Sequence, residues 1–333
     1  MDQIVPKSRV AAPRLDRAKF TDPDVTAQGE ARAHVALDRL DTLWINTGTL
    51  CNLTCAACYI ESSPTNDRLV YITAQEVGSY LDEIASLGLN TREIGFTGGE
   101  PFMNPDFPDM LADALARGFE ALVLTNAMQP MLRPRVMDAL LALRAAHGPR
   151  LTIRVSLDHY TAELNDDERG PGAFDKAIEG VNWLAENSFR IAIAGRTCWG
   201  ETEEIARTGY QALCATHGWP IDCTDPAQLV LFPEMDETAD VPEITTQCWS
   251  ILGKSPSDIM CASSRMVVKR KGADAPTVLP CTLIAYDERF EMGPTLSASL
   301  SANGGMFRDG SVKLNHPHCA RFCVLGGASC SAK

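Results

Sequence analysis

The sequence lacks the long apolar segments and the N-terminal features that direct a chain to a membrane. No apolar run approaches the roughly 20 residues that span a bilayer. The first residues, Met1-Asp-Gln-Ile-Val-Pro-Lys7, have neither the charged nor the apolar region of a secretory signal. We therefore expect a cytoplasmic protein with no membrane partner.

Positive charge is also scarce. The chain has 30 lysines and arginines against 43 aspartates and glutamates, which gives a net charge of −13. Affinity for DNA or tRNA comes mainly from cationic side chains that replace the counterions of the phosphate backbone. We therefore expect no nucleic-acid partner.

Apolar residues are plentiful, at 45% of the 333 residues, so the chain can bury a large core. The length favours one large domain, or one large domain and a small one. The sequence also contains 12 cysteines. In the cytoplasm cysteines seldom form disulfides, so clustered ones indicate metal binding.

The middle of the chain alternates short apolar runs with amphipathic ones. This pattern predicts strands at 43–49, 93–97, 121–125, 151–156, 190–194 and 227–232, and helices at 74–88, 106–118, 134–146, 173–187 and 201–216. Strands and helices that alternate strictly indicate an α/β fold with a parallel sheet and helices outside it. We expect an N-terminal arm over residues 1–40, a core over 41–240 and a small cysteine-rich C-terminal extension over 241–333.

Three of the cysteines, Cys51, Cys55 and Cys58, are spaced C-x3-C-x2-C just past the first predicted strand. A [4Fe–4S] cluster takes four ligands, so a loop that offers three thiolates leaves one iron free for another molecule. Zinc is the main alternative, although structural zinc prefers two paired C-x2-C motifs. Buried core cysteines are a second alternative, but a loop containing Asn52 and Thr54 is poorly suited to a core.

The cysteine loop resembles the cluster loop of radical S-adenosylmethionine (radical SAM) enzymes. Gly98-Gly99-Glu100 downstream is similar to that family's GGE motif, which receives the SAM amino group. The family usually has an aromatic residue before the third cysteine. This chain has Ala57 there and Tyr59 directly after Cys58, so Tyr59 is the candidate to pack against adenine. The resemblance implies an open (β/α)6 partial TIM barrel that binds SAM and a [4Fe–4S] cluster.

Other polar residues follow the predicted strands, where parallel barrels place their active sites. The resemblance assigns Ser156 to the SAM ribose, Arg196 to the SAM carboxylate and Asp158 to the ribose or the substrate, and Asn126 is expected among the cofactor contacts. A polar rim of strand caps is the alternative for each residue taken singly. Cys198 is a candidate hydrogen-atom donor to a substrate radical, or else a small core residue.

Cysteines return in the C-terminal third as Cys248, Cys261, Cys281, Cys319, Cys323 and Cys330. The apolar alternation between Cys261 and Cys281 predicts a β-hairpin with a thiol at each end. The pattern resembles the SPASM and Twitch extensions of radical SAM enzymes, which implies one auxiliary [4Fe–4S] cluster. Cys261, Cys281, Cys319, Cys323 and Cys330 are the candidate ligands, and which four of the six cysteines bind stays open. Zinc is again the alternative, because four thiolates also satisfy it.

The resemblance implies reductive cleavage of SAM to a 5′-deoxyadenosyl radical, which abstracts a hydrogen atom from a substrate. We expect a small polar metabolite as substrate, a net oxidation assisted by the auxiliary cluster, and an electron donor such as flavodoxin or ferredoxin. A maturase that modifies a ribosomally made peptide is the alternative. A non-catalytic iron–sulfur carrier or electron-transfer protein is the alternative of another class.

Overall fold

The structure is a computed structural model, which describes residues 13–234 and 236–327. Its main sheet has eight strands in the order β7-β6-β5-β4-β3-β2-β8-β9, and all neighbours are parallel except β8 and β9. The strands are β2 (Thr42–Asn46), β3 (Glu93–Thr97), β4 (Glu120–Thr125), β5 (Leu151–Ser156), β6 (Arg190–Arg196), β7 (Leu229–Phe232), β8 (Ser264–Val268) and β9 (Thr277–Leu279). The predicted open partial barrel is confirmed.

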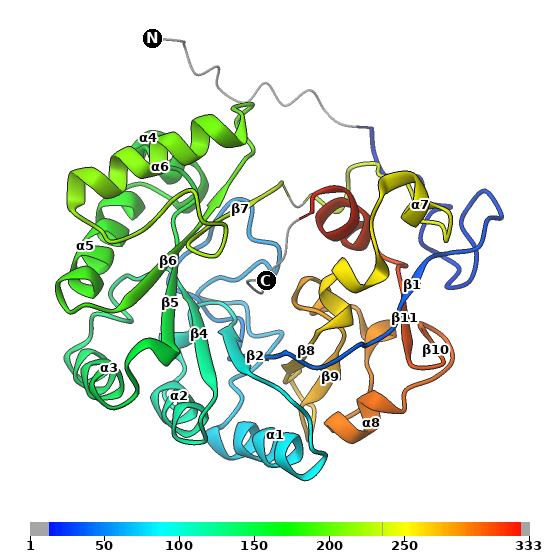
Figure 1. Ribbon diagram of the computed structural model, residues 1–333, viewed down its shortest axis with the longest axis horizontal. Coiled ribbons are helices and arrows are strands. Elements are labelled where there is room, and N and C mark those ends of the chain that lie inside the picture. Colours follow the sequence, from blue (N-terminus) through cyan, green and yellow to red (C-terminus); the bar gives the residue numbers. More distant parts are fainter. Residues whose placement is uncertain (1–12, 235, 328–333) are drawn as a thin grey trace.

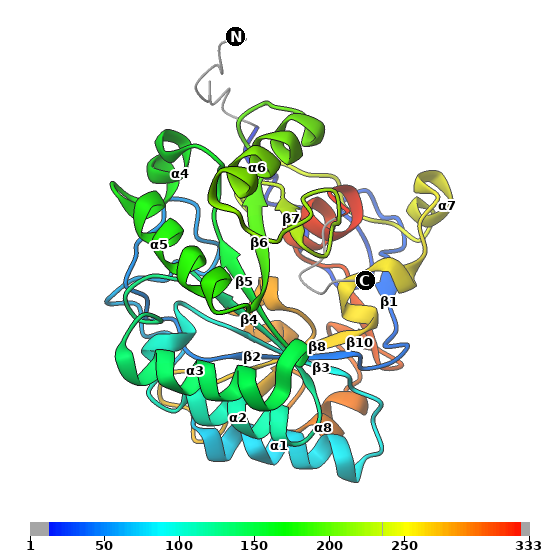
Figure 2. The same ribbon diagram turned by 60° about the vertical axis from the view of Figure 1, so that its left-hand side comes forward.

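Helices cover the outer side of strands β2 to β7 (Figures 1 and 2). The sequence pattern predicts all of them except the one over residues 162–169. They are α1 (Ala74–Ser86), α2 (Phe107–Ala116), α3 (Pro134–His147), α4 (Ala162–Arg169), α5 (Ala173–Glu186) and α6 (Glu203–His217). Helix α1 begins at a reciprocal cap, in which Thr73 Oγ1 accepts from the Glu76 amide and the Glu76 carboxylate accepts from the Thr73 amide. No described helix is long and apolar enough to cross a bilayer.

Strand β2 is buried along its whole length because its sheet is covered on both faces. It ends at Asn46, three residues earlier than the sequence pattern predicts. The Asn46 side chain accepts a hydrogen bond from the Gly48 amide at 2.9 Å, and this local turn takes the chain out of the strand. The cysteine loop follows directly from that turn.

The C-terminal hairpin differs from expectation in one respect. Strands β8 and β9 pair antiparallel as predicted, but β8 also pairs parallel with β2, so the hairpin extends the barrel's own sheet. All five residues of β8 are buried, which suits a strand with a neighbour on each side. The proposed divisions at residues 40 and 240 remain predictions.

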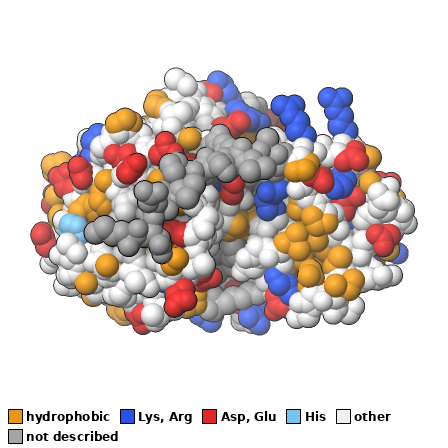
Figure 3. All heavy atoms as spheres, turned by 90° about the horizontal axis from the view of Figure 1, so that it is seen from above, with side chains coloured by type: hydrophobic (Ala, Val, Ile, Leu, Met, Phe, Trp, Pro, Cys, Tyr) orange, Lys and Arg blue, Asp and Glu red, His pale blue; other side chains and the backbone are white. Residues whose placement is uncertain are grey.

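The rest of the C-terminal region contains short elements beside the barrel, on the right of Figure 1. They are α7 (Cys248–Leu252), α8 (Leu296–Leu300), β10 (Phe307–Arg308), β11 (Ser311–Lys313) and a π-helical turn, Cys319–Leu325. The N-terminal strand β1 (His34–Val35) pairs with β11 in a separate antiparallel sheet. On the face seen in Figure 3, acidic and basic side chains are interspersed rather than gathered into one patch of either sign.

Glu243 fixes the described part of the N-terminal arm. Its carboxylate accepts from the amides of Phe20 and Ala27 at 2.7 and 2.6 Å and from the buried Arg32 guanidinium at 2.5 Å. Burial by itself would raise the pKa of Glu243, but these hydrogen bonds and the charge of Arg32 outweigh it and lower the pKa from 4.5.

We expect Glu243→Gln to lower the free energy of unfolding by about 2–3 kcal/mol at neutral pH, since the buried arginine loses its anionic partner. The stabilising effect of a carboxylate with a lowered pKa is present above pH 4.5 and disappears as the pH falls through the folded-state pKa. The difference between variant and wild type should therefore shrink on acidification. Denaturant titrations at several pH values test this, with the exposed Glu179→Gln as the matched control.

Candidate functional site

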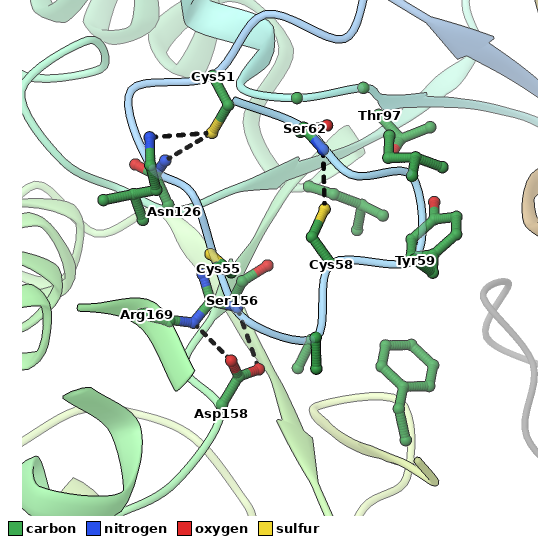
Figure 4. Close-up of a pocket in the computed structure, with 18 of the residues that line it drawn as sticks. Cys51, Cys55, Cys58, Tyr59, Ser62, Thr97, Asn126, Ser156, Asp158 and Arg169 are labelled. Atoms are coloured by element: carbon green, nitrogen blue, oxygen red, sulfur yellow. Dashed lines mark hydrogen bonds and ion pairs between the residues drawn. The ribbon is translucent and has the colours of Figure 1, made fainter. Parts of the chain in front are cut away.

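One cavity lies at the carboxyl ends of the barrel strands and gathers most of the predicted site residues (Figure 4). The predicted residues that line it are Cys51, Cys55, Cys58, Tyr59, Gly98, Gly99, Asn126, Ser156, Asp158 and Arg196. They come from the loops and ends of five successive strands, β2 to β6. The Glu100 side chain and Cys198 are not among its lining residues.

The three thiols of the cysteine loop are free and face this cavity. Backbone amides donate to two of the sulfurs: Leu53 to Cys51 at 3.4 Å and Ser62 to Cys58 at 3.3 Å. Burial raises the pKa of Cys51 to about 12 and also raises that of Cys55. The Cys51 and Cys55 thiols therefore hold their protons until a metal displaces them. Amide hydrogen bonds to sulfur are also among the contacts that set the reduction potential of an iron–sulfur cluster.

The Gly98-Gly99 turn lies against the backbone that precedes Cys51. The Gly99 amide donates to Gly48 O at 2.7 Å, and the Glu100 amide donates to Leu50 O at 3.1 Å. A Cβ at position 99 would lie 2.2 Å from Leu50 O, so only glycine permits this approach. Gly98 has a φ of +148°, which also favours glycine.

Glu100 lies beneath the cavity and connects two strand ends. Its carboxylate accepts from Phe102 N, from Thr125 Oγ1 at 2.8 Å and from Asn126 N at 2.9 Å. Complete burial raises the pKa of Glu100 to about 7, although these donors act in the opposite direction. Asn126 in turn donates to Asn52 Oδ1 in the cysteine loop at 2.9 Å. Glu100 therefore positions Asn126 against the loop.

Two arginines enter the site from the β5 and β6 side. Arg169, the last residue of α4, forms a two-pronged ion pair with Asp158 at 2.9 and 3.1 Å. Arg196, the last residue of β6, lies 3.7 Å from Glu168. Among the described residues, the buried Nε and Nη2 of Arg196 have no hydrogen-bond partner. An anionic group in the cavity would satisfy them.

A second group of thiols surrounds a smaller cavity in the C-terminal region, lined by Cys261, Cys281, Cys319, Cys323 and His318, among others. Burial raises the pKa of Cys261 to about 11, and burial with the neighbouring Cys281 and Cys261 raises that of Cys319. Cys248 does not line this cavity, and Cys330 lies outside the described residues.

The charge around the second group suits an anionic centre. The buried Arg265 on β8 donates to Cys261 O at 2.8 Å. Its guanidinium also lies close enough to Cys261 and Cys281 to interact with the negative charge of their thiolates. Burial lowers the pKa of Arg265 to about 10. Within the described ranges, no three His, Cys, Asp or Glu side chains are arranged as around a single metal ion. Four thiolates beside a buried cation are a donor set that fits a cluster.

The two cavities adjoin each other. Leu283 lines both of them, and Phe322, which lines the first, directly precedes Cys323, which lines the second. A group held by the C-terminal thiols would therefore lie behind one wall of the main cavity.

Arg169, Phe232, Leu283 and Phe322 also line the main cavity, although none of them is among the predicted site residues. For Arg169 a signal existed, because the stretch Arg169-Gly170-Pro171-Gly172-Ala173-Phe174 resembles a motif that often follows the fourth strand in radical SAM enzymes. The other three are apolar residues in apolar surroundings, and nothing in the sequence distinguishes them from core residues.

Comparison with known proteins gives a consistent result. The family model described as the radical SAM superfamily matches residues 45–205. The AdoMet-dependent heme synthase of Methanosarcina barkeri is 32% identical over 159 residues, which is 47% of this chain and 43% of that protein. The mycofactocin maturase MftC of Mycobacterium tuberculosis is 31% identical over 139 residues, 42% of this chain and 33% of that one. The match thus spans less than half the length of these relatives.

Solved structures share the fold over a longer stretch. SuiB of Streptococcus suis bound to S-adenosylmethionine aligns with a TM-score of 0.58 at 14% identity, over 80% of this chain and 66% of that one. The structure of histidine-tagged anSMEcpe with bound AdoMet aligns with a TM-score of 0.55 at 15% identity, over 79% of this chain and 80% of that one.

We expect Gly99→Ala to weaken SAM binding roughly tenfold or more, because the added methyl forces the turn and the cysteine loop apart at a cost of about 1–3 kcal/mol. Calorimetric titration of SAM into the anaerobic, iron-loaded protein measures this. Gly78→Ala on helix α1 is the matched control. A Cβ at position 78 would lie 3.6 Å from the Asp113 carboxylate and 3.9 Å from the Arg117 guanidinium, which is ordinary van der Waals contact. Equal SAM affinity in the two variants would contradict the assignment of the turn.

Proposed function

Because the chain belongs to the radical SAM superfamily through residues 45–205, we propose that it cleaves SAM reductively and abstracts a hydrogen atom from a bound substrate. The observation that carries the proposal is the convergence of three free thiols, the Gly98-Gly99 turn and the unpartnered nitrogens of Arg196 on one cavity. Three thiolates and a nearby cation suit a cluster with one open iron and an anionic ligand beside it.

The cysteine loop would hold the [4Fe–4S] cluster through Cys51, Cys55 and Cys58. When bound, such a cluster supplies the electron that cleaves SAM. Arg196 would bind the SAM carboxylate, and the backbone of Gly98 and Gly99 would face its amino group. The chain's own contribution is to orient the reacting groups and to exclude water.

Three further residues would contact the rest of the SAM molecule, and a fourth would support the cysteine loop. Ser156 and Asp158 would meet the ribose, with Asp158 held in place by Arg169. Tyr59 would pack against the adenine, and Asn126 would support the cysteine loop from the end of β4. Cys198, which does not line the cavity, remains a proposed hydrogen donor for the alternative reaction in which the substrate radical regains a hydrogen atom instead of losing an electron.

We assign an auxiliary [4Fe–4S] cluster to Cys261, Cys281, Cys319 and Cys323, which share one small cavity beside Arg265. Cys330 remains an alternative ligand. A fully ligated cluster has no vacancy for SAM, and through the wall at Leu283 it would lie next to the substrate. Its task would be to accept an electron from the substrate radical, which favours a net oxidation.

Two substrate classes remain. A small polar metabolite is the first, and a ribosomally made peptide is the second, with flavodoxin or ferredoxin as the electron donor. The relatives give support to a small molecule through the heme synthase, and the structure of SuiB bound to the precursor peptide SuiA supports a peptide. A non-catalytic carrier would have no use for a buried arginine with two unpartnered nitrogens in the cavity.

The decisive variant changes Cys51, Cys55 and Cys58 together to Ala. The anaerobically reconstituted protein with dithionite should form 5′-deoxyadenosine from SAM, and the triple variant should form none. Its iron should fall from about eight to about four per chain, since the C-terminal cluster remains. Cys198→Ala is the control and should keep both its iron and SAM cleavage. If the triple variant still cleaves SAM, the two thiol groups have been assigned the wrong way round.

The complementary variant changes Cys261 and Cys281 to Ala. We expect it to lose about four iron atoms per chain while it retains 5′-deoxyadenosine formation, because SAM binds at the other cluster. Iron, sulfide and zinc analysis with low-temperature EPR measures this. Stoichiometric zinc in the wild-type protein would instead assign the second group to a structural metal.

A further inference from the structure

Each charged side chain described in the lining of the main cavity has either an ion-pair partner or an assigned ligand. Among the described residues that line it, only Asp158, Arg169 and Arg196 carry charge. Asp158 and Arg169 form an ion pair with each other. Arg196 is assigned to the SAM carboxylate, so this step rests on the proposed function. No charged side chain of the described lining remains to receive an ammonium, carboxylate or phosphate group of a substrate.

A separate part of the lining is apolar. Phe232 at the end of β7 and Phe322 in the π-helical turn have ring centroids 5.5 Å apart at an interplanar angle of 34°. Leu283 completes this part, which we call the Phe wall: Phe232, Leu283 and Phe322. The three residues come from separate segments of the chain. The wall borders the second thiol group through Leu283 and Cys323.

The Phe wall discriminates between kinds of substrate group. A charged group placed against it would lose its hydration without gaining a partner, which is unfavourable. An apolar group gains free energy in proportion to the area that it removes from water. We propose that the substrate presents an uncharged aliphatic or aromatic group to the Phe wall. A metabolite or a peptide would then turn its apolar part inward and keep its charged groups away from this wall.

The experiment uses four probes that share one backbone and differ in side-chain chemistry. They are the N-acetyl amides of L-phenylalanine, L-leucine, L-lysine and L-aspartate. Ligand-observed NMR on the full, iron-loaded chain with SAM measures their affinities, and the variant described next shows whether a probe binds at the Phe wall. We expect the two apolar probes to bind roughly tenfold more tightly than the two charged ones.

Phe232→Ala tests the wall directly, because this ring is only half-buried at a strand end and its loss leaves the core intact. It should weaken the apolar probes roughly tenfold. Leu300→Ala, an exposed leucine on α8, is the matched control and should change nothing. Equal or tighter binding of the charged probes, no binding of the apolar ones, or an unchanged affinity in Phe232→Ala would overturn the proposal.

A parallel assay for 5′-deoxyadenosine separates this proposal from the proposed function. If SAM is not cleaved but the apolar preference holds, the proposed function fails and the Phe wall stands. If SAM is cleaved and the preference is absent, the Phe wall alone fails.

Discussion

The close approach of the Gly98-Gly99 turn to residues 48–50 is the contact on which the site depends. It joins the end of β3 to the start of the cysteine loop through two backbone hydrogen bonds, at a separation that excludes any side chain at position 99. With the turn in place, the Glu100 carboxylate reaches Thr125 and the Asn126 amide. Asn126 then reaches the loop at Asn52. Three strand ends are thereby tied to one another beneath the thiols.

The fold also brings together two thiol groups that are far apart in sequence, so that their cavities share a wall. Strand β8 pairs with β2, so the C-terminal hairpin is part of the sheet that carries the cysteine loop. Tyr286, soon after Cys281, donates to Ile60 O at 2.7 Å in that same loop. These contacts explain how an auxiliary centre could lie close enough to the main cavity to exchange electrons with a bound substrate.

Much of this could be predicted from the sequence, because its signals are local. The alternation of strands and helices, the three-cysteine loop and the Gly-Gly-Glu turn need only a few residues each to be recognised. Helix α4 was missed because its residues, Ala162–Arg169, are mostly polar and give no clear apolar periodicity, and Arg169 was missed with it. The pairing of β8 with β2 and the Phe wall depend on contacts between distant segments, which no local pattern encodes. The predicted roles of the individual site residues stay predictions.

The central claim is that SAM binds directly to a cluster on Cys51, Cys55 and Cys58. Electron–nuclear double resonance on the reduced protein with SAM labelled with ¹⁵N at the amino group and ¹⁷O at the carboxylate tests it most directly. We predict hyperfine coupling of both labels to the cluster, retained in the Cys261 and Cys281 double variant. Coupling that is absent in the wild-type protein, or that disappears only when the C-terminal thiols are removed, would contradict the account.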